Sequence, residues 1–289
     1  MKKLIHSLCV LSAAAMIGQA ETIYGLTDAN SIFTFDSATP GTVSPLINVT
    51  GLQVNEQLLG IDFRPRTGEL YGVGDTSRLY KINASTGVAT AVGGVFSTLL
   101  SGTVFGIDFN PVPDRLRIHS DSNQNLRINP ITGAVAATDA DLAYAAGDPN
   151  FGQDPNVVAT AYTNNQAFAT STMLYSLDSQ WDILNLHSGA PGFATLNTQS
   201  SVPFLNTNRV GFDISGVTGI GYISVSPNAF TNFYTIDVKT GMTNFVGQIG
   251  TGLTVMNITA APTPEPGTMA LAGAALAGAI AYARRRRMA

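Results

Sequence analysis

Cysteine is almost absent from this sequence of 289 residues, and its one copy, Cys9, lies in a short apolar segment at the N-terminus. If that segment is removed, the remaining chain has no thiol. This excludes disulfides, cysteine metal sites and cysteine nucleophiles. A chain of this length can bury enough apolar surface to fold without covalent crosslinks. We therefore expect its stability to come from a packed core alone.

Charged residues are also scarce, at 12% of the chain, which is about half the usual share. Two lysines lie at the N-terminus and four arginines at the C-terminus. Without them, nine of the fifteen basic residues remain, against eighteen of the nineteen acidic ones. A nucleic-acid-binding protein needs a basic patch that neutralises phosphates. The acidic body therefore excludes nucleic acid as a partner.

Histidine occurs only three times, and His119 and His187 are the two copies outside the N-terminal segment. His119-Ser120-Asp121 holds the residue types of a hydrolase triad, but three adjacent residues cannot converge as a triad does. The sequence also contains no Gly-x-Ser-x-Gly elbow and no Walker loop. These absences favour a protein without catalytic activity.

The first twenty residues have the composition of a signal peptide. Lys2 and Lys3 form its positive start, and a mostly apolar run follows as far as Ile17. Ala20 is a small residue where signal peptidase requires one, which predicts cleavage between Ala20 and Glu21. We therefore predict that signal peptidase releases an exported domain. The alternative is that the segment remains as an uncleaved membrane anchor.

The C-terminal end has three parts in order: a proline-punctuated linker at 261–268, an apolar span at 269–283 and a basic cluster. The linker contains Pro264, Glu265 and Pro266. The basic cluster is Arg284, Arg285, Arg286 and Arg287.

This order resembles the PEP-CTERM sorting signal of Gram-negative envelopes, with Thr263 standing where that signal commonly has Val. The resemblance implies that exosortase, a membrane transpeptidase-like enzyme, handles the protein and removes the tail. The span is shorter than the roughly 20 residues that a helix needs to cross a bilayer. The arginines would hold the terminus on the cytoplasmic side. We therefore predict a transient membrane anchor, with a permanent single-pass anchor as the alternative.

The body between these ends contains an internal repeat. Gly60-Ile61-Asp62-Phe63 recurs as Gly106-Ile107-Asp108-Phe109 and, in a varied form, as Gly211-Phe212-Asp213-Ile214. Each copy continues with short alternating segments and a Thr-Gly turn, and a degenerate copy begins at Val157. Four short strands in about 45 residues is the size of a propeller blade.

We therefore predict an all-β fold, a β-propeller of five four-stranded blades, with a β-sandwich of repeated sheets as the alternative. The N-terminal copy lacks its first strand and a strand at the C-terminus is left over, so these two should pair and close the ring. The predicted domains are a signal peptide at 1–20, the repeat domain at 21–260 and the sorting tail at 261–289. The predicted blades are 22–50 with 253–259, 60–94, 105–139, 156–198 and 209–250.

The body also resembles, over about residues 22–260, a family of secreted bacterial domains of unknown function. The resemblance rests on the Gly-Ile-Asp-Phe-x-Pro segment, the Leu-Tyr-Gly strand, and the pair Asp148-Pro149-Asn150 and Asp154-Pro155-Asn156. It implies no activity, because the family has none assigned.

Asp62, Asp108 and Asp213 occupy matching places on the predicted inner strands. A blade that needs the same hydrogen bond each time would repeat the residue, whereas a catalytic site needs asymmetry. We therefore interpret these aspartates as structural, with a catalytic or metal site as the alternative.

Asp121, Asn123 and Asn125 place oxygen atoms at alternate positions, as the opening of a calcium loop does. The sixth position is Leu126 and the twelfth is Thr132, where an EF-hand has Gly and Glu, so this is no EF-hand. A polar turn between strands is the simpler interpretation. We expect no cofactor, and calcium at these three residues is the one exception that the sequence permits.

These observations predict a non-enzymatic protein of the cell envelope or outer surface whose loops bind a polysaccharide or another surface protein. The alternative is a secreted propeller enzyme, a lyase or hydrolase acting on extracellular glycans or lactones. The enzyme would be favoured if Arg117, His119, Asp121 or the repeated aspartates lined one end of the central channel.

Overall fold

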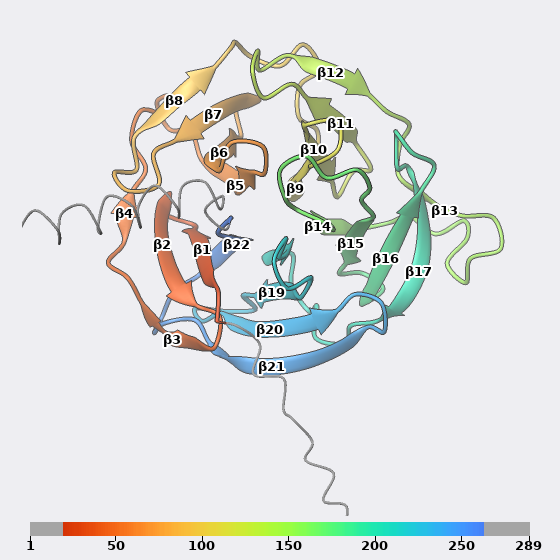
Figure 1. Ribbon diagram of the computed structural model, residues 1–289. Helices are drawn as coiled ribbons and strands as arrows, with labels where there is room; N and C mark the ends of the chain where they lie inside the picture. The colour runs from red at the N-terminus through yellow and green to blue at the C-terminus, as the bar shows by residue number, and fades with distance from the viewer. Residues whose placement is uncertain (1–19, 263–289) are drawn as a thin grey trace, which may run out of the picture.

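The computed structural model describes residues 20–262, and the regular elements of this part of the chain are all β-strands. The strands form five small sheets that stand around a central axis like the blades of a propeller (Figure 1). The predicted all-β propeller of five blades is therefore confirmed. No helix within residues 20–262 is long and apolar enough to cross a membrane. The predicted signal peptide and membrane anchor lie outside the described residues, apart from Ala20.

We number the blades around the ring, and each is given from its innermost strand outwards. Blade 1 is β22 (Val255–Ala260), β1 (Thr22–Thr27), β2 (Ser31–Asp36) and β3 (Thr39–Val43), with β4 (Ile47–Asn48) beside β2. Blade 2 is β5 (Leu58–Arg64), β6 (Glu69–Gly74), β7 (Arg78–Ile82) and β8 (Ala89–Val92). Blade 3 is β9 (Phe105–Asn110), β10 (Arg115–Ser120), β11 (Asn125–Ile128) and β12 (Val135–Thr138).

Blade 4 is β14 (Val157–Tyr162), β15 (Leu174–Asp178), β16 (Ile183–Ser188) and β17 (Thr195–Ser201), with β13 (Ala143–Tyr144) on its outer edge. Blade 5 is β18 (Val210–Ile214), β19 (Gly221–Val225), β20 (Asn232–Asp237) and β21 (Met242–Gln248). Because β-hairpins alternate the chain direction, the inner strands all begin on one face of the disc and end on the other. We call these the start face and the end face.

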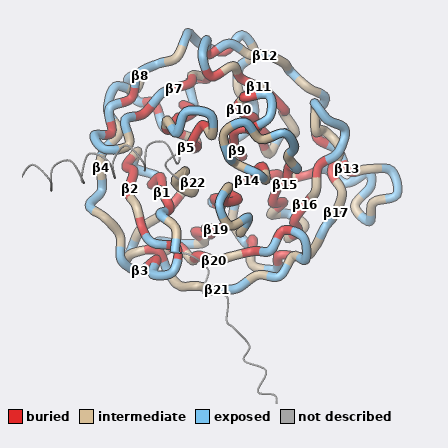
Figure 2. Tube along the Cα trace, viewed as in Figure 1, coloured by how far each residue is buried: buried red, intermediate tan, exposed pale blue. Residues whose placement is uncertain are grey.

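Burial falls from the inner strands to the outer ones, as Figure 2 shows. Every residue of β9, β14 and β18 is buried, since both faces of an inner strand pack against neighbouring blades. The outermost strands β8, β12 and β21 consist mostly of partly buried and exposed residues. Fully buried runs therefore mark the inner strands, and among these three outer strands only β12 alternates regularly.

The ring closes through the two ends of the chain. Strand β22 pairs antiparallel with β1, with Tyr24 opposite Thr259 and Gly25 opposite Ile258. The C-terminal strand thus supplies the inner strand that the N-terminal copy of the repeat lacks, as predicted. The strand occupies 255–260 instead of 253–259, because the turn after β21 continues as far as Thr254.

Two short strands add to the four strands that were predicted for each blade. Strand β4 pairs with the start of β2, and β13 pairs parallel with β17. The segment between β12 and β14 is longer than the other connections between blades, and after β13 it projects beyond the rim of the disc (Figure 1). Two-residue strands carry too little periodicity to be recognised in a sequence.

Four of the five interfaces between blades are apolar. Separate clusters of buried side chains fill the contacts of blade 1 with blade 2, blade 2 with blade 3, blade 4 with blade 5, and blade 5 with blade 1. The interface between blades 3 and 4 instead contains many polar groups, including Arg117, His119, Asn125 and His187, all of them buried. The repeat is therefore broken at one interface.

We predict that a chain ending at Gly250 will not fold, whereas a chain ending at Pro262 will be as stable as the whole domain. Removing β22 deletes the buried side chains of Val255 and Ile258 and exposes the edge of β1. The two side chains alone contribute about 3–6 kcal/mol, a large part of the roughly 5–15 kcal/mol that holds a typical domain folded. Urea denaturation of residues 21–250 and 21–262 measures this. Equal midpoints would contradict closure by β22.

Candidate functional site

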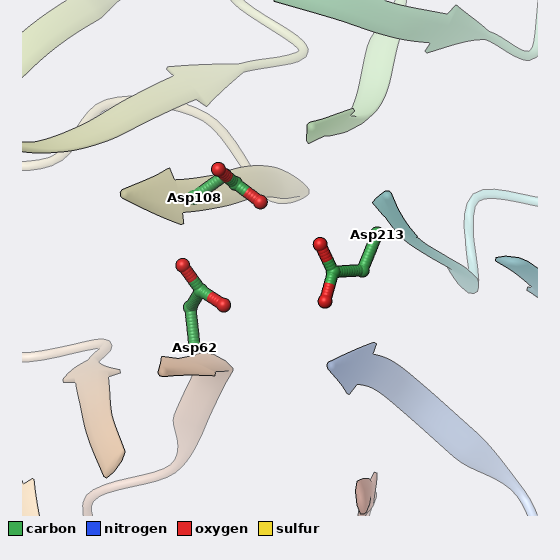
Figure 3. Close-up of side chains that lie close together, drawn as sticks. All are labelled: Asp62, Asp108 and Asp213. Carbon is green, nitrogen blue, oxygen red and sulfur yellow. The ribbon is translucent and has the colours of Figure 1, made fainter. Parts of the chain in front are cut away.

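Three aspartates meet in the central channel. Asp62 lies on β5, Asp108 on β9 and Asp213 on β18, and all three side chains are buried. Figure 3 shows their carboxylates directed towards one another from three different blades. The equivalent places on the other two inner strands hold Ala161 and Thr259, as the strand registers show.

Each aspartate binds the backbone of the next blade. Asp62 accepts a hydrogen bond from the Phe109 amide at 2.7 Å. Asp108 and Asp213 repeat this contact at the Tyr162 amide (3.2 Å) and the Ala260 amide (2.6 Å). The recurring hydrogen bond predicted from the repeat is therefore present, and it links three of the five pairs of neighbouring inner strands.

The side chain of Thr259 adds a further link. Its hydroxyl lies 2.8 Å from an oxygen of Asp62 and 3.1 Å from an oxygen of Asp213. Since Thr259 belongs to the C-terminal strand, the closing strand joins the blades on both of its sides.

The three carboxyls cannot all be ionised at low cost. Burial first, and then the neighbouring Asp213 carboxylate, raises the pKa of Asp62 well above its ordinary value of 3.8. Burial and the charges of Asp62 and Asp213 do the same to the pKa of Asp108, and burial raises the pKa of Asp213. Shared protons can relieve this repulsion. A cation can also relieve it, because one oxygen from each residue lies within 4.8 Å of the other two.

The three side chains of the calcium-like turn, Asp121, Asn123 and Asn125, each form hydrogen bonds with a different residue. Asp121 accepts hydrogen bonds from the amide and hydroxyl of Thr103, and Asn123 donates to Asp154. Asn125 is fully buried and accepts a hydrogen bond from Arg117. Calcium binding at Asp121, Asn123 and Asn125 stays a prediction.

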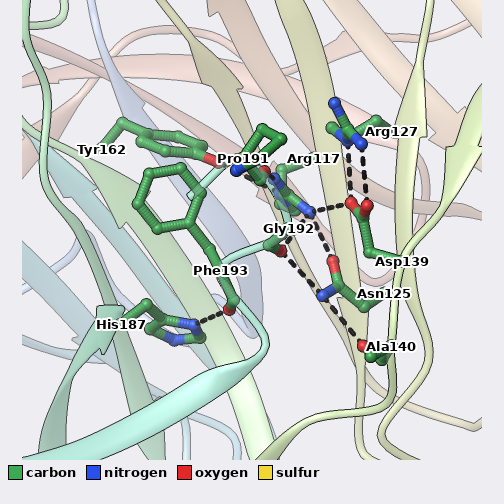
Figure 4. A network of polar contacts seen from close by, with 10 residues as sticks. All are labelled: Arg117, Asn125, Arg127, Asp139, Ala140, Tyr162, His187, Pro191, Gly192 and Phe193. Atoms are coloured by element: carbon green, nitrogen blue, oxygen red, sulfur yellow. Dashed lines mark hydrogen bonds and ion pairs between the residues drawn. The ribbon is translucent and has the colours of Figure 1, made fainter. Parts of the chain in front are cut away.

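The second polar centre lies between blades 3 and 4 and is built around Arg117, whose side chain is 1% exposed (Figure 4). Its guanidinium donates to Asp139 at 2.8 Å, to the Tyr162 hydroxyl at 3.0 Å, and to Asn125. It also donates to the Pro191 and Gly192 carbonyls, at 2.8 and 2.9 Å. Asp139 in turn binds Arg127 through both oxygens, at 2.7 Å each. The network therefore joins β10, β11 and β14 to the β16–β17 turn.

Two histidines stack beside this network. The rings of His119 and His187 are parallel within 5°, with centroids 5.0 Å apart. His187 Nδ1 lies 2.7 Å from the Phe193 carbonyl and its Nε2 lies 2.8 Å from the Ser176 hydroxyl. Because a carbonyl only accepts, Nδ1 carries the proton and Nε2 accepts from Ser176. His119 is fully buried, and neither of its ring nitrogens has a hydrogen-bond partner within residues 20–262.

Both histidines are neutral at physiological pH. Burial, followed by the neighbouring His187, lowers the pKa of His119 well below 6.5. Burial lowers the pKa of His187 to about 4. Each charge would be created next to the Arg117 guanidinium, so acid weakens this interface.

The structure separates the residues that the sequence had grouped. The repeated aspartates do line the channel, but Arg117 and His119 lie between two blades and Asp121 lies in a turn on the start face. Ser176, Tyr162 and Asp139 were missed. One signal was available for Arg117: it stands opposite Asp108, where the other blades with an inner aspartate have Tyr71 and Tyr222.

We predict that Asp108→Asn raises the stability of the folded protein at pH 8. The folded-state pKa of Asp108 is raised, so the folded protein holds a proton that the unfolded chain releases above its ordinary value of 3.8. Stability is therefore lost as the pH rises through the folded pKa, and the neutral amide removes that loss. We expect roughly 2–4 °C in melting temperature, on the order of 1 kcal/mol. Thermal melts at pH 8 and pH 4 measure this.

Asp28→Asn, at an exposed turn, is the matched control for this substitution and should leave both melts unchanged. The opposite result would be a lower melting temperature for Asp108→Asn than for the parent at pH 8. If that difference disappears once divalent cations are removed from the parent protein, a cation neutralises the aspartates.

We predict that Arg117→Ala destabilises the domain by about 3–5 kcal/mol. The change removes a buried partner from Asn125 and the Tyr162 hydroxyl, and it leaves Asp139 with Arg127 alone. Arg66→Ala is the control, since the Arg66 side chain is 45% exposed. Guanidinium denaturation compares the two. A loss no larger than that of the control would mean that solvent reaches the interface.

The comparisons with known proteins identify the family of the body and the sorting motif of the C-terminal end. No curated protein matches this chain. Among solved structures, a Lactobacillus plantarum protein is similar at 13% identity and a TM-score of 0.42, over 80% of this chain and 67% of that one. The model of the PEP-CTERM protein-sorting motif matches residues 262–287, so the protein carries a signal for export to the cell envelope or surface, which exosortase processes. The model of the domain of unknown function DUF4394 matches residues 20–259, and the protein therefore belongs to that family.

Proposed function

We propose that this protein is a non-catalytic propeller that acts at the cell surface, where its loops bind a polysaccharide or another surface protein. One observation carries the proposal. The side chains suited to catalysis, the three channel aspartates, the two histidines and Ser176, are buried. Most of them also form contacts between blades.

Open cavities lie elsewhere in the molecule. One of about 590 Å³ lies among the β14–β15, β18–β19 and β20–β21 connections, and another of about 310 Å³ lies beside β2. Neither is lined by the channel aspartates, the histidines or Ser176. A substrate in either cavity would therefore not contact any of those six side chains.

The N-terminal end of the domain supports cleavage after Ala20. The carboxylate of Glu21 accepts hydrogen bonds from Ser215, Thr218 and Tyr222 of blade 5, and its amide donates to Ser37. Among residues 20–262, Glu21 is thus the first residue that hydrogen bonds fasten to the fold. Cleavage before it leaves the folded domain intact.

Both ends of the domain leave from the end face. Strand β1 begins there and β22 ends there, and Pro262 lies near Gly68 in the β5–β6 turn. The sorting tail follows directly, so we propose that the end face is directed towards the envelope and the start face outwards.

A hydrolase is the second candidate, because Ser176 and His187 have the hydrogen bond and the tautomer of a nucleophile and its general base. Ser176 is 0% exposed, however, so a substrate could reach it only if blades 3 and 4 separated. A screen against lactones and glycans decides this, and turnover that Ser176→Ala abolishes would favour the enzyme.

The proposed function predicts how the protein is processed and where it is found. Mature protein should begin at Glu21 and lack Arg284, Arg285, Arg286 and Arg287, and antibodies should label it on intact cells. Intact-mass measurement of envelope material gives both ends. Envelope protein that retains the four arginines, or labelling only after lysis, would contradict a sorted surface protein.

A further inference from the structure

One segment on the start face departs from the repeat. The connection from β12 to β14 carries β13 and then projects beyond the rim of the disc (Figure 1). It contains Asp148-Pro149-Asn150 and Asp154-Pro155-Asn156. Asp148 fastens the first part, since its carboxylate accepts from the amide and hydroxyl of Thr198 at 2.6 and 2.8 Å. The loop is therefore held in place while its tip stays exposed.

Aromatic side chains accompany this loop. Phe151, at its tip, is 63% exposed. Trp181, in the neighbouring β15–β16 turn, is partly exposed, and its indole N–H lies 3.4 Å from the Asp154 carbonyl. Phe151 is three residues from Asp154, so its Cα lies within about 11 Å of the Asp154 Cα. A sugar ring presents an apolar C–H face that packs on such aromatic rings.

Short polar side chains from three blades surround the aromatics. Asn123 of blade 3 donates to Asp154 at 2.7 Å, and Asn156 donates to Ser179 at 2.8 Å. Ser179 in turn donates to Asn208, which precedes blade 5, at 2.8 Å. These bonds hold each amide in one orientation. Asp154 and Asn208 are exposed, and carboxylate and amide groups pair with sugar hydroxyls as donors and acceptors.

We propose that this surface, made of Phe151, Asp154, Asn156, Trp181 and Asn208, binds a neutral polysaccharide. The inference rests on the proposed surface function and names its ligand class and its site. The charge on this side favours a neutral chain over an anionic one, because Asp148, Asp154 and Asp182 outnumber Arg209. Its rigid amides and partly exposed rings suit an extended chain that lies across the start face.

The single tryptophan of the chain makes the test direct, because emission excited selectively from tryptophan comes from Trp181 alone. The exported protein is titrated with soluble starch, dextran, laminarin and hydroxyethyl cellulose, and with alginate as the anionic comparison. At least one neutral polysaccharide should change the emission of Trp181 and retard the protein in affinity gels, and alginate should do neither. Phe151→Ala and Asp154→Ala should each weaken binding about tenfold, as loss of a central contact does.

Phe245→Ala is the matched control, because Phe245 is a 55% exposed aromatic on the outermost strand of blade 5. It should bind as the parent does, and all three variants should melt as the parent does. Binding that Phe151→Ala and Asp154→Ala leave intact would overturn this site while the proposed surface function stood. No response to any neutral polysaccharide would overturn the ligand class, and surface labelling decides the broader function separately.

Discussion

Pairing of the first and last strands of the domain is the interaction on which the rest of the structure depends. Inner strands such as β9 and β14 are buried on both faces only because every blade has two neighbours. An open ring would expose one face of a terminal blade and the edge of β1. The pairing of Tyr24 with Thr259 therefore maintains the burial of the blades on both sides of the closure.

The channel aspartates show how a repeat can bury carboxyl groups where their ionisation is unfavourable. In each of three blades, one aspartate provides a good hydrogen bond to the next inner strand. Three of them also converge, because the inner strands of a ring all approach one axis. Alanine and threonine at the other two positions, Ala161 and Thr259, keep the number of facing carboxylates at three.

The interface between blades 3 and 4 is where the protein departs most from its own repeat. Arg117 replaces the aromatic residue of the neighbouring blades, and its hydrogen bonds then require Asp139, Asn125 and the turn that carries Pro191. Blade 4, which forms one side of this interface, also carries the projecting loop with Asp154 and the partly exposed Trp181. Departures from symmetry thus gather on one side of the ring, which is where a repeat protein acquires an individual property.

The sequence alone determined the all-β class, the five blades and the closing strand, because repeated motifs and strand periodicity are local patterns. The position of Gly60-Ile61-Asp62-Phe63 and its copies was enough to identify the inner strands and to assign their aspartates a recurring hydrogen bond. Short β4 and β13 came in addition to the four strands predicted for each blade, since two residues have no period. Only the tertiary structure decided that Asp62, Asp108 and Asp213 face one another, that His119 stacks on His187, and that Trp181 meets Asp154. Each of these contacts joins residues far apart in the chain. The first two depend on how blades pack around a closed ring, and the third depends on how the loop before β14 lies against the β15–β16 turn.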